Sequence, residues 1–361
     1  MARARALVYD PYLATLGGGE RYMFAVAETI RGSFDVVVGG RDVPLPSTLS
    51  ARGLPDDFVM SAMSDREFTR QSASFDLAVV VTIDIPPRSR AHSSLLIVQF
   101  PFARFRPWRP IRALERARIL RGYQAVVYSD FVREWATRRW HINARVISPT
   151  IDRGLPDAAA KGQTILSIGR FNTSGNRKRQ DVLIDAFVSL PESVRSGWRL
   201  VLAGAAPVDH QTDKYLATLR QQAAGHRIEF ALNVPQVELV DLLGEASLYW
   251  HAAGYGRKPT QPQAAEHFGI STVEAMSWGA VPLVYDDGGQ HEIVTPDVGV
   301  RWQTVEELVR ETVMLMTDGA RRAELSRSAV EASKSYSRER FEDLVLSSVE
   351  DLMTRDPSSR R

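Results

Sequence analysis

The sequence predicts an α/β protein built from two doubly wound domains. Its 361 residues exceed what one hydrophobic core usually organises. Short apolar runs alternate with segments of helical periodicity in two successive series, which a polar, proline-containing stretch at 149–163 separates. We therefore expect a first domain over residues 1–150, a second over 151–330 with a ligand cleft between them, and a C-terminal helix and tail over 331–361 packing back on the first.

The first series opens with an apolar strand at residues 5–9, a glycine turn in LGGGE (16–20) and a helix at 21–30. A strand, turn and helix in this order are typical of a parallel sheet. Further strands are expected at residues 34–40, 75–82, 95–100 and 125–129.

The second series repeats the alternation. Its expected strands are residues 164–169, 198–204, 228–232, 246–252 and 280–286, and its expected helices are 178–190, 213–224, 236–244, 271–278 and 304–316. The tail from about 320 to 355 is charged and has apolar residues at helical spacing, which suits a helix that packs across the first domain.

Composition narrows the class of protein. The hydrophobic fraction is 44% and the charged fraction 24%, near the averages for soluble proteins, and no apolar run approaches the ~20 residues of a membrane span. The N-terminus has no apolar signal-peptide core, so we expect a cytoplasmic protein. Because the chain has no cysteine, its chemistry must rest on His, carboxylates, Lys, Arg and backbone groups.

Charge is distributed unevenly along the chain. Residues 1–150 hold 21 Arg, no Lys and 14 acidic residues, a net charge of +7, which leaves −5 for the rest. The basic, aromatic stretch from Arg104 to Arg121 can form an amphipathic helix from Ile111 onward, and its composition is compatible with peripheral contact with an anionic membrane on its inner face. The alternative is a cationic outer helix with its apolar side in the core.

The strongest chemical signal is EHFGISTVEAMSWGAVPLVYDDGGQHEIV, residues 266–294. Glu266 is expected on a loop, and Glu274, eight residues later, on the opening turn of a helix that begins near Ser271. The amides of this helix N-terminus suit a diphosphate. They belong to Phe268, Gly269, Ile270, Ser271 and Thr272. Alternatively, Ser271 and Glu274 form a capping box, in which the glutamate only bonds the cap's backbone amide.

Two cations are expected in SIGRFNTSGNRKRQDVLIDAF, residues 167–187. Arg170 lies just beyond a strand and Lys178 at the start of the next helix, so their charges can converge. Fixed cations stabilise the charge that develops on a departing diphosphate, a role that a metal fills elsewhere. The neighbouring Arg177 and Arg179 are expected to face solvent.

The glycine turn LGGGERYMFAVAE is a weaker signal. Gly18 and Gly19 allow a ligand to approach the backbone where a side chain would clash. The turn is not the G-x-G-x-x-G fingerprint of dinucleotide sites, and similar turns occur in proteins that bind no cofactor.

Together these segments resemble the retaining glycosyltransferases of family 4, which have the GT-B fold, over nearly the whole chain. The sequence E-H-F-G-I-S-T-V-E-A-M is similar to the paired-glutamate motif of that family, as are the G-A-V-P-L-V and G-G-Q-H-E-I-V that follow. The resemblance implies that Glu266 contacts the donor sugar and Glu274 the ribose hydroxyls. It places the loop around Gly288, Gly289 and Gln290 near the donor.

The same resemblance assigns Arg170 and Lys178 to the diphosphate and Gly18 and Gly19 to the cleft. It implies a hexosyltransferase (EC 2.4.1 type) that retains anomeric configuration by front-side displacement and needs neither a metal nor another cofactor. The implied donor is GDP-mannose first and a UDP-sugar second, and the acceptor is a glycan, a lipid-linked molecule or a small molecule. One departure is Gln99, in IVQFPF, where several relatives, including dolichol-pathway mannosyltransferases, have a histidine.

Other functions remain open from the sequence: a sugar-nucleotide epimerase, a non-catalytic nucleotide-sugar-binding protein, or a retaining glycosidase with two carboxyls about 5 Å apart. The Arg170 and Lys178 pair disfavours the glycosidase, which has no diphosphate to stabilise. No aromatic-basic motif on a sheet face supports nucleic acid, and Asp286 with Asp287 lacks a third metal ligand. Residues 253–265 are expected to form either a mobile loop that orders over the donor or an ordinary surface insertion.

Overall fold

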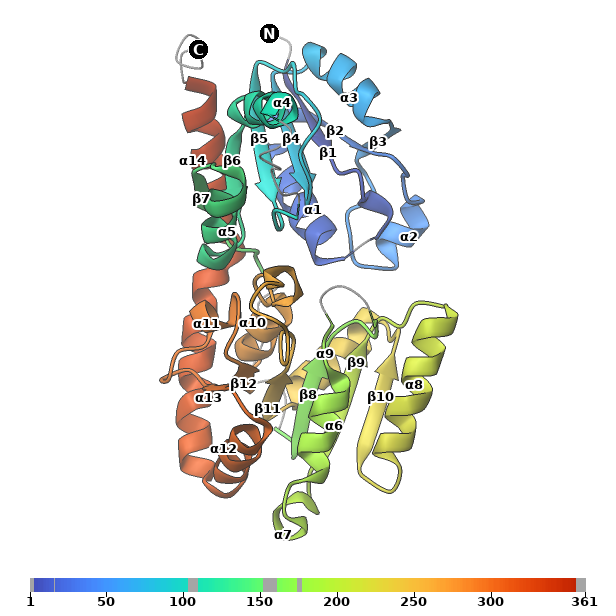
Figure 1. The fold of residues 1–361 in the computed structure, drawn as a ribbon, viewed down its shortest axis with the longest axis vertical. Coiled ribbons are helices and arrows are strands. Elements are labelled where there is room, and N and C mark those ends of the chain that lie inside the picture. The colour runs from blue at the N-terminus through green and yellow to red at the C-terminus, as the bar shows by residue number, and fades with distance from the viewer. Residues whose placement is uncertain (1–2, 16, 103–109, 152–160, 174–176, 355–361) are drawn as a thin grey trace. The chain divides into compact units, whose positions relative to one another are not determined.

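The protein divides into two compact units, each built around one parallel sheet (Figure 1). The first unit comprises residues 1–150 with 338–361, and the second comprises residues 151–337. The structure is a computed structural model that describes residues 3–15, 17–102, 110–151, 161–173 and 177–354. Most of the expected linker at 149–163 lies outside the described residues.

The sheet of the first unit has seven parallel strands in the order β3-β2-β1-β4-β5-β6-β7. They are β1 (Ala4–Tyr9), β2 (Phe34–Gly40), β3 (Val59–Ala62), β4 (Leu77–Thr82), β5 (Ser93–Val98), β6 (Gln124–Val127) and β7 (Ala144–Val146). The order reverses at β1, where Tyr9 pairs with Gly39 of β2 on one side and Val80 of β4 on the other. Such a reversal is where ligands commonly bind doubly wound sheets.

Helices cover both faces of this sheet. They are α1 (Gly18–Ile30), α2 (Pro46–Ser50), α3 (Asp65–Gln71), α4 (Pro110–Arg121), α5 (Asp130–Trp140) and α14 (Arg338–Thr354), with single 3-10 turns at Leu13–Thr15 and Ser72–Ser74. Alternate strand residues such as Leu7, Val80 and Leu96 pack with Phe68 of α3 and Trp140 of α5. Residues between them in the strands point to the opposite face, where α14 contacts β5.

Helix α14 completes the first unit although it follows the second in sequence. Its buried residues recur at helical spacing, and Phe341 meets the ring of Tyr22 in α1 edge-on at 5.3 Å. Arg338 Nη2 donates to Glu28 Oε2 at 2.8 Å, and Ser93 Oγ donates to the Leu352 carbonyl at 3.3 Å. The preceding helix, α13, belongs to the second unit, so the chain re-enters the first unit at Arg338.

The second unit has six parallel strands in the order β10-β9-β8-β11-β12-β13. They are β8 (Thr164–Ile168), β9 (Arg199–Gly204), β10 (Ile228–Leu232), β11 (Leu248–His251), β12 (Val281–Tyr285) and β13 (Val300–Trp302). Its helices are α6 (Gln180–Val188), α7 (Glu192–Arg195), α8 (His210–Ala223), α9 (Gln236–Glu245), α10 (Ile270–Ser277), α11 (Gln290–Ile293), α12 (Val305–Thr317) and α13 (Gly319–Ser333), with 3-10 turns at Pro262–Ala264 and Lys334–Tyr336.

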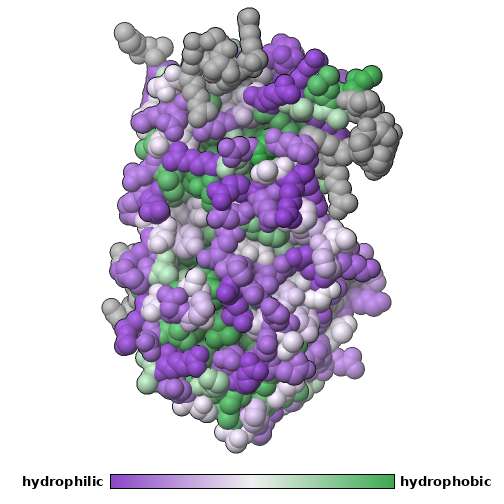
Figure 2. All heavy atoms as spheres, turned by 60° about the vertical axis from the view of Figure 1, so that its left-hand side comes forward, coloured by the Kyte–Doolittle hydropathy of each residue, from purple (hydrophilic) through white to green (hydrophobic). Residues whose placement is uncertain are grey.

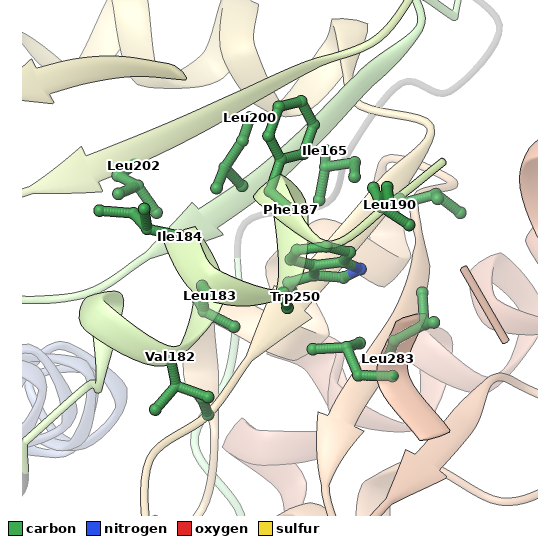
Figure 3. Close-up of a cluster of buried hydrophobic side chains, with 14 of the residues drawn as sticks. Ile165, Val182, Leu183, Ile184, Phe187, Leu190, Leu200, Leu202, Trp250 and Leu283 are labelled. Carbon is green, nitrogen blue, oxygen red and sulfur yellow. The ribbon is translucent and has the colours of Figure 1, made fainter. Parts of the chain in front are cut away.

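The larger core of this unit lies between the sheet and α6 (Figure 3). Phe187 of α6 points toward Ile165 and Leu200 of neighbouring strands, and the indole of Trp250 lies beside them. All four side chains are fully buried. This packing fixes the carboxyl ends of β8 and β11, which carry the candidate site.

The predicted pair of doubly wound parallel sheets is confirmed. Strands β3, β7 and β13 were not predicted. All three are edge strands of three or four residues, and Val59 of β3 is exposed, so they lack the continuous apolar run by which the central strands were recognised.

Hydrophilic side chains dominate the face shown in Figure 2, where hydrophobic ones form only small patches. Within the described residues, no helix has both the length and the apolar character needed to cross a bilayer. The hydrophobic side chains are gathered mainly in the cores of the two units.

We expect Phe187→Ala to lower the free energy of unfolding of the second unit by about 3–5 kcal/mol, because it removes a fully buried ring and leaves a cavity. Urea unfolding followed by circular dichroism measures the loss. Val208→Ala is the control, since Val208 is fully exposed and its change should stay within about 0.5 kcal/mol. Equal stabilities for Phe187→Ala and the wild type would contradict the packing in Figure 3.

Candidate functional site

The carboxylate of Glu266 is the centre of the candidate site. Its Oε2 accepts hydrogen bonds from Lys178 Nζ and, at 3.0 Å, from His251 Nε2. The exposed fractions are 14% for the Glu266 side chain, 22% for Lys178 and only 2% for His251. The three residues come from three places in the sequence: the approach to α6, the end of β11, and the loop before α10.

The electrostatics of this cluster keep Glu266 ionised. Burial raises the pKa of its carboxyl, but the Lys178 ammonium and the hydrogen bond from His251 outweigh that effect and hold the pKa well below its usual range. Burial lowers the pKa of His251. The imidazole is therefore neutral near pH 7, and its Nε2 carries the proton that is donated to Glu266.

Lys178 reaches this position because the residue facing it is glycine. A Cβ on Gly169, just past β8, would lie 2.5 Å from Lys178 Cγ. Gln180 ties the same turn to α6, since its Nε2 donates to the carbonyls of Gly169 and Arg170 at 3.3 Å each. The predicted pair of cations thus comes from one connection, in which Arg170 is exposed and Lys178 is partly buried.

Arg179 is not the solvated cation that the sequence predicted. It adopts a left-handed conformation (φ 53°) at the start of α6 and binds Asp181 through Nε and Nη2. Its Nη1 donates to the Tyr255 carbonyl at 2.6 Å. Because these contacts occupy the guanidinium, Arg179 anchors the loop after β11, whereas Arg177 is exposed as expected.

Helix α10 starts at Ile270, one residue before the expected start at Ser271, and without the capping box that was the alternative interpretation. Its N-cap is Gly269, at φ 122°, and no side chain caps it. Ser271 lies inside the helix, and its hydroxyl shares a 2.8 Å hydrogen bond with Tyr249. The Ser271–Glu274 capping interpretation is therefore wrong. The amides of Ile270 and Ser271 point out of the first turn, where no carbonyl of the same helix can reach them.

The glycine pair after β12 packs directly on the loop that carries Glu266. Gly288 has φ 62°, and a Cβ there would lie 2.1 Å from the Glu266 carbonyl. The Gly289 amide donates to that carbonyl at 2.8 Å. Gln290 Nε2 donates to Thr272 Oγ1 at 2.8 Å, so this loop lies against the first turn of α10.

Phe268 contributes to this site through its backbone. Its ring is 4% exposed and meets Tyr336 edge-on at 5.4 Å, so the side chain is part of the packing. A Cβ on Gly289 would lie 2.6 Å from the Phe268 Cα, which explains why this position is a glycine. Glu274, the fifth residue of α10, is partly buried.

The loop at 253–265 is tethered at two points. Arg179 binds the Tyr255 carbonyl, and the guanidinium of Arg257 binds both carboxylate oxygens of Asp287. Asp286, the neighbouring carboxylate, accepts from His291 and pairs with Arg301 at 3.6 Å. In the described parts of the chain, no three His, Asp or Glu side chains are grouped so that they could hold a metal ion.

The predicted glycine turn lies in the first unit, at the start of α1. Gly18 and Gly19 are the first residues of α1, and a Cβ on Gly19 would lie 2.1 Å from Gln99 Nε2. Gln99, which stands where several relatives have a histidine, therefore lies against the glycine turn. Nearby, Asp10 is fully buried; burial and the charge of Glu20 raise the pKa of its carboxyl to about 7.

The structure therefore brings most of the predicted residues of the second unit to one sheet edge. Sequence reasoning missed His251 and Gly169. His251 had a recognisable signal, since it ends an apolar strand at the edge of the sheet where Glu266 was expected. Gly169 had none, because its role depends on a side chain nine residues away in sequence.

We expect His267 to contribute a loss of stability as the pH drops from about 6.5 to about 4, whereas Asp10, whose pKa is raised, contributes in the opposite direction. Burial lowers the pKa of His267 to about 4, so the unfolded chain takes up a proton at a pH where the folded chain does not. His251 acts in the same direction. Urea unfolding at pH 7, 5.5 and 4 measures the free energy of unfolding, and His267→Gln should gain stability relative to the wild type as the pH falls. The exposed control, His210→Gln, should follow the wild type; a pH dependence of His267→Gln equal to that of the wild type would exclude His267 as a contributor.

Characterised relatives match part of this chain. The human GDP-Man:Man(3)GlcNAc(2)-PP-Dol alpha-1,2-mannosyltransferase is 29% identical over 205 residues, 53% of this chain and 39% of that protein. The GDP-mannose:cellobiosyl-diphosphopolyprenol alpha-mannosyltransferase of Komagataeibacter xylinus is 32% identical over 180 residues, 46% of this chain and 39% of that protein. The matched region thus spans about two-fifths of the length of each relative.

Among solved structures, HepE of Anabaena in complex with UDP superposes with a TM-score of 0.73 and 16% identity, covering 96% of this chain and 100% of that one. This likeness confirms the predicted GT-B type of fold. The family model described as "Glycosyl transferases group 1" matches residues 152–332, half of the chain and nearly all of the second unit. This chain is therefore a member of the glycosyl transferases group 1 family.

Proposed function

We propose that this chain is a retaining glycosyltransferase that moves a hexose from a nucleotide-diphosphate sugar to an acceptor hydroxyl. The observation that carries the proposal is the cluster of Lys178, Glu266 and His251 at the sheet edge where α10 begins. It combines an ammonium for phosphate, an ionised carboxylate for sugar hydroxyls, and a helix N-terminus for anionic oxygens. The cluster lies within the residues that the family model matches.

Lys178 can bind a diphosphate and Glu266 at the same time. Its ammonium has three N–H donors, and Glu266 accepts one of them. The other donors, the exposed guanidinium of Arg170 and the first amides of α10 offer positive charge to a phosphate. We propose that these groups take the place of a metal in stabilising the leaving diphosphate.

In the reaction we propose, the bond between the sugar C1 and the phosphate oxygen breaks, and its electron pair stays on the diphosphate. The acceptor oxygen bonds to C1 on the same face, so the anomeric configuration is retained. The departing phosphate oxygen takes the acceptor proton. Lys178 and Arg170 stabilise the negative charge of the leaving group, while Glu266 holds the sugar through a hydroxyl and Glu274 binds the ribose.

GDP-mannose is the first candidate donor and a UDP-sugar the second. Both relatives described above are named as using GDP-mannose, and they align at 29% and 32% identity. HepE binds UDP, but its likeness to this chain is in fold, at 16% identity. The same two relatives act on molecules linked to dolichol or polyprenol diphosphate, which supports a lipid-linked glycan as acceptor.

The ionisation of Glu266 excludes it as the general acid of a glycosidase. A retaining glycosidase needs one carboxyl that is protonated near neutral pH and acts as the general acid. Lys178 and His251 shift the pKa of Glu266 in the opposite direction, so it cannot donate that proton. An epimerase or a non-catalytic binder of nucleotide sugars would share the diphosphate contacts, and sugar transfer from the donor distinguishes them from a transferase.

We also propose that α4 contacts an anionic membrane surface. Ile111 is 83% and Leu114 is 49% exposed, whereas Leu120 is buried, so the helix has apolar side chains on its outer as well as its inner side. Exposed arginines such as Arg118 and Arg121 would each contribute about 1 kcal/mol near anionic lipid. Residues 103–109 of the basic stretch, which include Arg104, lie outside the described residues.

GDP or GDP-mannose should stabilise the wild type without magnesium. At about a hundred times its dissociation constant, the ligand adds about 2.7 kcal/mol to the free energy of unfolding. Lys178→Ala should weaken binding by about 1.5–3 kcal/mol because a charged hydrogen bond to phosphate is lost, and Lys214→Ala, an exposed lysine of the same unit, should not. Thermal unfolding with GDP, UDP, ADP and their sugars measures this. Unchanged binding by Lys178→Ala would refute the diphosphate assignment.

Replacing Ile111 and Leu114 together with glutamate should weaken binding to vesicles of anionic phospholipid by more than about tenfold, since it removes apolar contact and adds negative charge. Vesicle co-sedimentation gives the affinities, and vesicles of phosphatidylcholine alone should bind neither protein. Val208→Glu, which changes a fully exposed apolar residue of the second unit, serves as control. A double variant that binds like the wild type would rule out α4 as the contact.

A further inference from the structure

Both partners of Glu266 bond the same carboxylate oxygen. Lys178 Nζ and His251 Nε2 converge on Oε2. Among the described residues, Oε1 has no hydrogen-bond partner, so it is the oxygen that can accept a hydrogen bond from a ligand. A carboxylate held on one oxygen and open on the other is arranged to bind a hydroxyl in a fixed direction.

A bound nucleotide-sugar donor would affect Lys178 and His251 differently. Lys178 is a cation with 22% of its side chain exposed, and a diphosphate would compete with Glu266 for its ammonium. A buried carboxylate that loses its partner becomes costly to keep ionised. His251 is 2% exposed and neutral, so an arriving anion neither attracts it nor reaches it.

We propose that His251 is a positioning residue for the donor sugar: its neutral imidazole keeps the Glu266 carboxylate oriented and ionised while Lys178 engages the diphosphate, leaving Oε1 for a sugar hydroxyl. The inference rests on the proposed function, because it needs a diphosphate at Lys178 and a sugar at Glu266. In the absence of a donor, the Lys178–Glu266 ion pair holds both side chains close to their working positions.

The bond to Glu266 is the one that orients the imidazole. His251 Nδ1 is buried and has no partner among the described residues, so Nε2 makes the only hydrogen bond recorded for the ring. The other charged or titratable groups that interact with this cluster are Tyr249, His267 and Glu274. Tyr249 binds Ser271, and burial keeps its phenol neutral, so it adds no charge beside the carboxylate.

The test compares His251→Leu and His251→Gln with the wild type, measuring GDP affinity, kcat and KM for GDP-mannose hydrolysis to free mannose, and the pH profile of kcat/KM. We expect His251→Leu to bind GDP within about twofold of the wild type, since Lys178 is intact. Its kcat should fall about 10- to 100-fold, the usual effect of losing a hydrogen bond to a charged group. The acid limb of its pH profile should move to higher pH, because Glu266 loses a donor that lowers its pKa.

His251→Gln separates positioning from packing. The glutamine amide nitrogen lies at about the same reach from the backbone as imidazole Nε2, so it can restore the bond and return kcat to within about threefold of the wild type. His210→Gln, at an exposed site, is the control for the substitution itself. A kcat and a pH profile in His251→Leu that match the wild type would overturn the inference. So would equal losses in both His251 variants with lowered thermal stability, which indicate a packing role.

The outcomes also separate this inference from the function on which it rests. If GDP binds the wild type, Lys178→Ala loses that binding, and His251→Leu hydrolyses GDP-mannose normally, then His251 has no positioning role and the proposed function stands. If GDP and UDP both fail to bind the wild type, the proposed function and the inference fall together.

Discussion

The partly buried carboxylate of Glu266 is the interaction on which the site depends. A carboxylate with only 14% of its side chain exposed stays ionised only if donors replace the water it has lost, and Lys178 and His251 do so from different segments. Each needs its own support: Gly169 leaves room for Lys178, and β11 ends at His251. The position of one carboxylate therefore constrains the connections after β8 and β11 and the loop before α10.

The glycines around α10 also help to hold the Glu266 carboxylate in position. Gly288 and Gly289 allow one loop to pack on the backbone of Glu266 and Phe268, at distances where any side chain would collide. Gly269, at φ 122°, begins the helix and faces the amide of Gln290. The motif places glycines at these positions, and the structure explains them by close contacts at all three and by positive φ at Gly269 and Gly288.

Much of the fold followed from periodicity, because a central strand of a parallel sheet is buried on both faces and therefore continuously apolar, as in β4 and β5. The edge strands β3, β7 and β13 escaped prediction because they have only three or four residues and are partly exposed, whereas the five-residue edge strand β10 was predicted. The cationic pair and the loops near α10 followed from motifs. The interpretations that failed concerned Arg179 and the Ser271–Glu274 cap, where a polar residue at a helix start has several available partners and local sequence does not select among them.

The sequence by itself determined the class of fold, two doubly wound sheets, and showed a chain without thiols that has carboxylates and cations in the segments of the candidate site. Only the tertiary structure decided which side chains meet. His251 and Glu266 are 15 residues apart and Lys178 and Glu266 are 88 apart, yet all three lie at one sheet edge. Hydrophobic periodicity is a local property of the chain, whereas the pairing of buried charges depends on the strand order, which brings the carboxyl ends of β8 and β11 together.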